Sequence, residues 1–155
     1  MIISRTPFRV SFFGGGTDYP AWYSKNGGAV LATSIDKYCY ISCRKLPPFF
    51  PCKHRIVYSI IESVTKNKEI KHPVVREVFE WMRVSEGLEV HHDGDLPARS
   101  GLGSSSSFTV GLLNALYASL GSIVSKERLA KEATFVEQEL VGDYVGCQDQ
   151  IASSY

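Results

Sequence analysis

The residues best suited to chemistry lie in a glycine- and serine-rich segment, 101–107, directly ahead of a stretch with helical periodicity. Gly101 and Gly103 let backbone N–H groups approach a ligand without a Cβ in the way. The serines that follow supply hydroxyl and unpaired N–H groups at a helix N-terminus, where the macrodipole is positive. This arrangement predicts an anion site, most naturally for phosphate. The alternative is a serine-rich N-cap without a ligand, which is common.

Three well-known phosphate-binding patterns do not describe this segment. A Walker loop ends in Gly-Lys-Ser/Thr, and no lysine is present here. The dinucleotide fingerprint needs a third glycine and an acidic residue about twenty positions further on, and both are missing. The His-Arg-Asp and Asp-Phe-Gly segments of protein kinases are also absent from the chain.

Three acidic residues lie in short polar segments, and each has a purely structural alternative. Asp18 is placed to N-cap a helix that Pro20 helps to start. Glu137 is one of several glutamates near the end of a predicted helix, where most such side chains are solvated. Asp149 could cap a helix that begins at Gln150. On local grounds alone, these alternatives compete with functional roles.

Composition limits the class of protein. The 155 residues suffice for one domain with a sizeable core, and 44% hydrophobic and 21% charged residues are ordinary for a soluble globular protein. A net charge of +1, with no basic stripe interleaved with aromatics, predicts no nucleic-acid partner. No stretch is apolar enough for a transmembrane helix, and the N-terminus lacks a signal-peptide layout. We therefore expect no membrane partner and a cytoplasmic location.

Four cysteines allow two interpretations. Cys39 and Cys43, together with Cys52 and His54, have a spacing that could suit zinc. However, the residues around Cys39 and Cys43 alternate as in a strand, where cysteine behaves as a small buried hydrophobe. Reduced thiols agree with the expected cytoplasmic location.

Hydrophobic periodicity predicts a mixture of strands and helices. The expected strands lie over 2–13, over 29–44 as one or two strands, over 55–64 and over 88–92, with a sharp loop at 14–16. The expected helices are a short one over 18–26, one over 72–82, one after the glycine-serine segment, and one from an N-cap at Ser125 to Leu140. The helix after the glycine-serine segment is expected to bury one face through Phe108, Leu112, Leu116 and Leu120. With no repeats and no interdomain linker, the order predicts a single α+β domain over 1–155.

The same segments carry a family resemblance. The stretch from Pro97 to Ser105 resembles the second motif of the GHMP kinases, the family of galactokinase, homoserine kinase, mevalonate kinase and phosphomevalonate kinase, which reads Pro-x-x-x-Gly-Leu-Gly-Ser-Ser. The stretch from Arg9 to Asp18 resembles the first motif, which in galactokinase reads Arg-Val-Asn-Leu-Ile-Gly-Glu-His-Thr-Asp. Glu137 and the segment 146–150 match a glutamate and a Gly-Ile-Met-Asp-Gln segment of galactokinase at the same spacing.

The resemblance implies roles for individual residues. Asp149 would face the substrate hydroxyl as a catalytic residue, and Arg9 would lie near the transferring phosphate. Mg²⁺ would be held by Ser105 and Glu137. The residues implied to bind ATP are Pro97, Arg99, Ser100, Gly101, Leu102, Gly103, Ser104, Ser105 and Ser106. Those implied to bind the substrate are Gly15, Gly16, Thr17 and Asp18; since the two glycines replace Glu-His, a galactose-specific site is disfavoured.

Within the family, the chain resembles the branch of the D-glycero-D-manno-heptose 7-phosphate kinases. That branch implies ATP-dependent phosphorylation of the anomeric hydroxyl to a 1,7-bisphosphate. Its members are considerably longer, so the chain looks like their N-terminal domain. The resemblance thus implies a fold like ribosomal protein S5 domain 2, a helix-backed sheet with a left-handed βαβ unit, and an inactive fragment without the C-terminal domain.

Several alternatives stay open on the sequence alone. The substrate could be another sugar, such as fucose or galactose, and the chain could belong to a non-catalytic sugar or nucleotide sensor. An RNA-binding module of the S5 type is disfavoured by the near-neutral charge. Arg99, Lys37 and Arg44 are candidates for holding the substrate's own phosphate, with a solvated surface position as the alternative for each. The anomer and the oligomeric state are not determined by the sequence.

Overall fold

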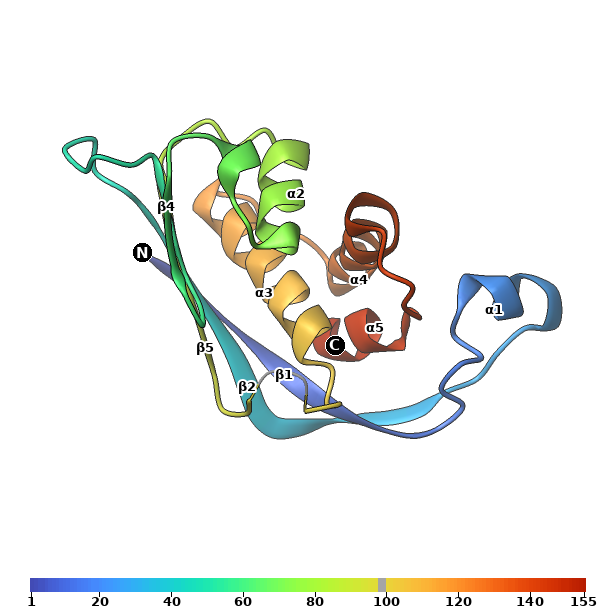
Figure 1. Cartoon of the computed structure of the whole chain (residues 1–155). Coiled ribbons are helices and arrows are strands. Elements are labelled where there is room, and N and C mark those ends of the chain that lie inside the picture. Colours follow the sequence, from blue (N-terminus) through green and yellow to red (C-terminus); the bar gives the residue numbers. More distant parts are fainter. Residues whose placement is uncertain (98–99) are drawn as a thin grey trace.

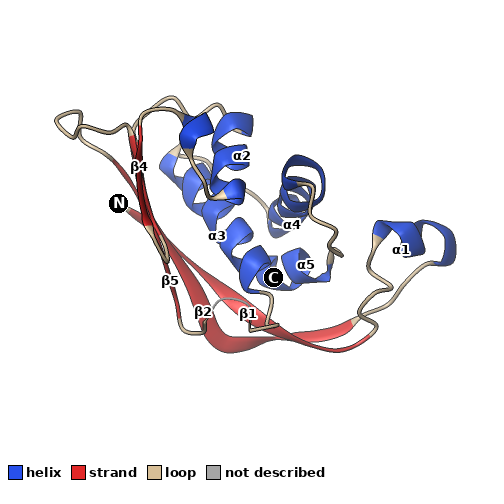
Figure 2. Cartoon of the chain, in the orientation of Figure 1, coloured by secondary structure: helices blue, strands red, loops and turns tan. Residues whose placement is uncertain are grey.

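The computed structural model describes residues 1–97 and 100–155, which form one five-stranded sheet with most helices gathered on one face and the short helix Pro20–Asn26 set apart beyond the ends of two strands (Figure 1, Figure 2). The strands are β1 (Ile2–Phe13), β2 (Leu31–Lys45), β3 (His54–Val57), β4 (Ile61–Val64) and β5 (Leu88–Gly94). The helices are α1 (Pro20–Asn26), η1 (Asn67–Glu69), α2 (Pro73–Trp81), α3 (Ser104–Ser119), α4 (Lys126–Phe135), η2 (Val136–Val141) and α5 (Gln148–Ser154). None of the helices in these two ranges is long and apolar enough to cross a bilayer.

The sheet order is β1-β2-β5-β3-β4. All neighbouring strands are antiparallel except β3 and β5, which run parallel and are connected through β4 and α2. This confirms the α+β class. The single strand predicted over 55–64 is wrong, because the chain turns between β3 and β4, where the Tyr58 N–H donates to the Ile60 carbonyl at 2.9 Å. The segment predicted as one or two strands over 29–44 is one long strand, β2.

Helix α3 lies against β1 and β2 at the centre of the domain. Phe108, Leu112 and Leu116 are buried as predicted, but Leu120 is 67% exposed and the opposite side of the helix is buried as well. The prediction of one buried face is therefore wrong, since α2, α4 and α5 cover the side that faces away from the sheet. Gly111 permits the close approach to the sheet, because a Cβ there would lie 2.9 Å from the Thr6 hydroxyl oxygen.

The last predicted helix divides into two parts. Ser125 caps α4 as expected, its hydroxyl accepting a hydrogen bond from the Arg128 N–H at 3.2 Å. After Phe135 the chain widens into the π-helix η2, which carries Glu137. Such π-helical insertions occur frequently at functional sites.

The buried cysteines behave as core residues. Cys39 and Cys43 project from β2 into the hydrophobic core, and burial raises the pKa of Cys39 to about 12 and that of Cys43 to about 11. Within the described part of the chain, no three His, Cys, Asp or Glu side chains form a cluster suited to a metal ion. The core interpretation of these two cysteines is confirmed.

Candidate active site

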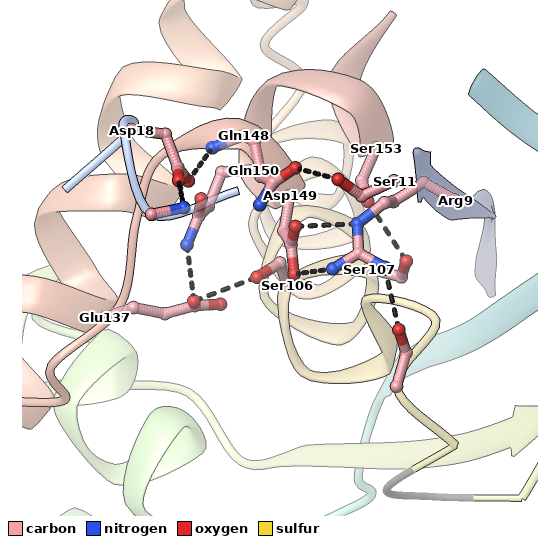
Figure 3. Close-up of polar contacts among 12 residues, drawn as sticks. Arg9, Ser11, Asp18, Ser106, Ser107, Glu137, Gln148, Asp149, Gln150 and Ser153 are labelled. Carbon is pink, nitrogen blue, oxygen red and sulfur yellow. Dashed lines mark hydrogen bonds and ion pairs between the residues drawn. The ribbon is translucent and has the colours of Figure 1, made fainter. Parts of the chain in front are cut away.

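A cavity of about 350 Å³ opens where β1, the N-terminus of α3, η2 and α5 meet. It brings together residues from both ends of the chain. The sequence-predicted residues that line it are Arg9, Asp18, Gly101, Gly103, Ser104, Ser105, Ser106, Glu137 and Asp149. Figure 3 shows several of these side chains converging from separate elements. Gln148 and Gln150 also line the cavity, although the sequence suggested no role for them.

Arg9 and Asp149 form a two-pronged ion pair across the cavity. The arginine Nε and Nη2 each donate to one Asp149 carboxylate oxygen, both at 2.7 Å, while Nη1 donates to the Gly101 carbonyl at 2.9 Å (Figure 3). Bidentate pairs of this kind fix both partners in orientation. Helix α5 begins at Gln148, and its N-cap residue is Cys147. The interpretation of Asp149 as a helix cap is therefore wrong.

The glycine-serine segment forms a tight turn that ends in the N-terminus of α3. Gly101 and Gly103 have φ angles of 75° and 77°, in the left-handed region that favours glycine. Gly103 is the N-cap residue, and the first intrahelical bond runs from the Ser107 N–H to its carbonyl at 2.9 Å. No side chain among the described residues caps the helix, and its N-cap is Gly103, so the serine-cap interpretation is wrong. The N–H groups of 104–106 have no intrahelical acceptor, and the cavity borders these residues.

The rest of the predicted nucleotide segment is less enclosed. Pro97 and Ser100 are exposed, and Leu102 is partly buried, with its carbonyl accepting from the Arg9 N–H at 3.0 Å. Arg99 lies outside the described residues. Its predicted role in binding ATP or the substrate phosphate stays a prediction.

Glu137 is buried to 1% exposure beside the helix terminus. Its Oε2 accepts from the Ser106 hydroxyl at 2.9 Å and from Gln150 Nε2 at 2.6 Å, whereas Oε1 has no partner among the described residues. Burial raises the pKa of Glu137. A solvated surface glutamate is therefore the wrong interpretation, and an unpartnered buried carboxylate oxygen is suited to a hard cation such as Mg²⁺.

The two neighbouring serines divide their roles. Ser106 is buried and engages Glu137, whereas Ser105 is exposed and lines the cavity. Glu137 therefore bonds Ser106, whereas the family resemblance implied Ser105 as the serine at the metal. Ser105 lines the same cavity as Glu137, and its role at a metal stays a prediction.

Asp18 is 6% exposed and faces the start of α5. Its carboxylate accepts from the Gly16 N–H at 2.9 Å and from the Gln148 N–H at 3.2 Å. The N-cap of α1 is Tyr19, so the interpretation of Asp18 as a cap is wrong. At Gly146 a Cβ would lie 1.8 Å from the Asp18 carboxylate, which only a glycine at that position avoids.

The remaining predicted substrate residues shape the loop that carries Asp18. Thr17 donates its hydroxyl to the Gly14 carbonyl at 2.7 Å, which closes the loop after β1. Gly15 and Gly16 present backbone only, and a Cβ at Gly16 would meet nothing within 4 Å. The loop therefore leaves open space beside Asp18.

Two candidates for the substrate's own phosphate lie elsewhere. Arg44 forms an ion pair with the buried Glu89 on the face of the sheet away from the helices, and it does not line the cavity. Lys37 is exposed on β2 and is likewise not part of the cavity wall. For Arg44, the ion pair with Glu89 is a better interpretation than a contact with the substrate phosphate.

Comparison with known proteins agrees with the resemblance to the GHMP kinases. A profile described as the GHMP kinases N terminal domain matches residues 62–155. A D-glycero-alpha-D-manno-heptose 7-phosphate kinase of Campylobacter jejuni is 29% identical, with 99% of this chain and 48% of the relative covered. A galactokinase of Pyrococcus furiosus is 31% identical, with 97% of this chain and 43% of the relative covered. The chain thus spans about half the length of the curated relatives it matches.

Solved structures agree on the fold. A D-glycero-D-manno-heptose 1-phosphate kinase from Bacteroides thetaiotaomicron superimposes with a TM-score of 0.86 at 22% identity, over 100% of this chain and 54% of that one. A galactokinase of Lactococcus lactis, complexed with galactose, gives a TM-score of 0.76 at 21% identity, over 99% of this chain and 42% of that one. Profile, relatives and fold together show that the chain belongs to the GHMP kinases and corresponds to their N-terminal domain.

Proposed function

We propose that the full-length protein carrying this chain is an ATP-dependent sugar kinase. Its substrate would be D-glycero-D-manno-heptose 7-phosphate, phosphorylated on the anomeric hydroxyl to the 1,7-bisphosphate. The observation that carries the proposal is the Arg9–Asp149 pair beside the open N-terminus of α3. That arrangement puts a carboxylate, a guanidinium and free N–H groups around one cavity, which suits transfer of a phosphoryl group.

The nucleotide phosphates would lie at the N-terminus of α3. The unpaired N–H groups of 104–106 and the positive end of the helix dipole suit an anion there. Gly101 and Gly103 keep the approach free of Cβ atoms. Arg99 would add a positive charge from the preceding segment.

Mg²⁺ would be held by Glu137 and Ser105, with Ser106 as a further oxygen donor. Glu137 Oε1, which has no partner among the described residues, supports this assignment, since the hydrogen bonds to Oε2 leave one oxygen of a buried carboxylate uncompensated. When bound, the ion neutralises charge on the transferring phosphate oxygens. Gln150 and Ser106 hold the other Glu137 oxygen and so orient the carboxylate.

Asp149 would accept or orient the proton of the substrate hydroxyl. Arg9 fixes the carboxylate and places a permanent positive charge beside the transferred group. Asp18, held by two backbone N–H groups, would accept hydrogen bonds from sugar hydroxyls. Phosphoryl transfer needs little covalent chemistry from the protein, so positioning and charge compensation supply most of the rate.

The test is a kinase assay on the full-length protein against a panel of hexoses, hexose phosphates and heptose phosphates, with Mg²⁺ and ATP. Heptose 7-phosphate should give the highest kcat/KM, with the 1,7-bisphosphate as product. Preference for fucose or galactose would replace the proposed substrate while keeping the kinase class. Sugar and ATP binding without turnover of any panel member would favour a sensor. The 155-residue chain alone should be inactive, and substantial turnover by it would contradict the proposal that activity needs the C-terminal domain.

A further inference from the structure

Helix α5 is joined to β1 by two successive side-chain contacts, here called clasps. Arg9 binds Asp149, and two residues further along the strand the Ser11 hydroxyl donates to Gln148 Oε1 at 2.7 Å (Figure 3). Pairing with β2 is regular from Arg9 to Ser11, so these two strand residues project from the same face. The side chains of Asp149 and Gln148 are thus held next to each other by one strand.

In the second clasp, only the oxygen of the Gln148 side-chain amide is engaged. Its Oε1 is occupied by Ser11, while the described residues offer Nε2 no acceptor, and Gln148 borders the cavity. A Cβ built on Gly15 would lie 3.5 Å from Nε2, so the glycine leaves the approach to this donor open. An amide that is held through its oxygen in this way presents a fixed N–H donor.

A donor and an acceptor border the same cavity. Asp18 and Gln148 both line it, and the Gln148 backbone N–H holds the Asp18 carboxylate at 3.2 Å, so the residue that carries the free Nε2 also anchors the Asp18 acceptor. A sugar hydroxyl both donates and accepts, and it would satisfy both at once. Because Arg9 and Ser11 hold Asp149 and Gln148 along one face of β1, a hydroxyl bound at Gln148 would be the neighbour of the one that reacts.

We propose that Gln148 determines substrate specificity by donating from Nε2 to the hydroxyl vicinal to the reacting one, which Asp18 binds as acceptor. This rests on the proposed function, in which the anomeric hydroxyl reacts, so the hydroxyl that is recognised is the one on C2. The substrate class is then a sugar with a free 2-hydroxyl. Sugars that lack it or carry it substituted are rejected.

The experiment combines one substitution with one change in the substrate. Gln148→Met keeps the length and approximate volume of the side chain but removes the amide. For the full-length protein we measure the dissociation constant by calorimetry and kcat/KM by assay, with heptose 7-phosphate and its 2-deoxy counterpart. The wild type should bind the 2-deoxy sugar more weakly through the loss of both hydrogen bonds, the one from Gln148 and the one to the Asp18 carboxylate. In the variant only the bond to Asp18 remains, so its discrimination between the two sugars should be about 3- to 10-fold smaller than that of wild type, with the KM for ATP within about twofold of wild type.

Ser11→Ala is the matched control, because it breaks the same clasp and leaves the Nε2 donor in place. It should keep a preference for the sugar with the 2-hydroxyl. If Gln148→Met keeps the full loss on the 2-deoxy sugar, Gln148 is only a structural link and the inference is overturned. Sugar binding without turnover would refute the proposed kinase function while the two dissociation constants still test Gln148. Absence of any binding by the wild type would overturn both proposals.

Discussion

At the level of single residues, Arg9 positions the carboxylate of Asp149, and the carboxylate is the group that would react. Both Asp149 oxygens accept from the guanidinium, so the carboxylate cannot rotate freely. Each oxygen still has a lone pair left for a substrate proton. Arg9 is tied down further through Gly101, which links the pair to the turn before α3.

Asp149→Asn should lower kcat strongly while the KM for ATP changes little. Asparagine keeps the shape but cannot take up a proton at neutral pH, and a positioned base contributes roughly 10²- to 10⁴-fold in rate. Steady-state kinetics on the full-length protein give the answer, with circular dichroism as the control for folding. A kcat within about threefold of wild type would remove Asp149 from the mechanism.

Glu137→Gln should weaken Mg²⁺ binding and stabilise the metal-free protein. Losses even in the outer shell of a metal site cost about 10- to 100-fold in affinity or activity, so loss of this carboxylate should raise the Mg²⁺ requirement at least that much. Burial raises the pKa of Glu137 above its unfolded value. The folded state therefore favours the protonated form, and stability falls as the pH rises through the folded-state pKa.

Glutamine does not ionise, so the variant should be more stable than wild type at neutral pH and similar to it at pH 4. Denaturant unfolding without Mg²⁺ at both pH values measures this. Glu139→Gln, two residues further along η2, serves as the control. An unchanged Mg²⁺ titration together with unchanged stability would refute the role assigned to Glu137.

At the level of elements, the N-terminus of α3 is suited to binding an anion because no side chain of residues 1–97 or 100–155 caps it. Gly103 adopts a left-handed conformation and supplies no side chain. The helix end is held by its burial against β1 and β2 and by the Ser107 hydroxyl, which donates to the Pro7 carbonyl at 2.8 Å. The N–H groups of the first turn are therefore left for a ligand.

Gly103→Ala should impair the site more than Gly101→Ala. Both positions have a positive φ, so both variants carry similar backbone strain, on the order of 1 kcal/mol. Only the Gly103 methyl would contact Arg9, whose Cγ lies 3.1 Å from the ideal Cβ position, whereas a Cβ at Gly101 meets nothing within 4 Å. We expect equal thermal stabilities but a larger fall in kcat for Gly103→Ala. Equal kinetic losses would show that the turn, and not the contact with Arg9, sets the activity.

At the level of the whole molecule, the interior carries histidines on the helix-facing side of the sheet. His72 stacks on Phe108 at 4.6 Å between ring centroids, and burial lowers the pKa of His72 to about 4, with Glu62 opposing and His92 adding to the shift. Burial also lowers the pKa of His92, which meets Phe108 edge-on at 5.1 Å. These side chains pack as neutral rings.

Protonation of His72 should therefore destabilise the domain as the pH falls below 6.5. The folded-state pKa of His72 lies below its ordinary value of 6.5, so the unfolded chain binds more protons in that range. Its contribution is present above pH 6.5 and is lost as the pH falls toward about 4. A shift of this size corresponds to on the order of 3 kcal/mol.

His72→Phe retains the stacking ring and cannot protonate, so it should flatten the dependence of stability on pH across this window. Denaturant unfolding of wild type and variant at a series of pH values between 7 and 4 measures it. His91→Phe is the control, because His91 is 40% exposed and bonds Glu89 on the other face of the sheet. A difference in stability between wild type and His72→Phe that stays constant between pH 6.5 and 4 would contradict the argument, since the contribution of Glu137 is common to both proteins.

Much of the fold and of the candidate site could be predicted from local patterns. The bounds of β1, the Ser125 cap and the α+β class depend on alternation and capping residues that neighbours in sequence decide. The β3–β4 hairpin was missed because the segment between the strands, Tyr58-Ser-Ile60, carries no Gly, Pro or Asn to mark a turn. The fully buried α3 was missed because periodicity within one helix does not reveal how many elements will cover it.

The sequence by itself determined which chemical groups the protein has and their order: a glycine-serine turn before a helix, and Arg9, Asp18, Glu137 and Asp149 at family spacing. Only the tertiary structure decided which of them meet. Arg9 reaches Asp149 across 140 positions of sequence, and Ser106, not Ser105, bonds Glu137 across 31. Such contacts depend on how the sheet and helices pack, because hydrophobic burial is non-directional and leaves partner choice to the geometry of the whole domain. For the same reason, no local signal pointed to the clasp between Ser11 and Gln148.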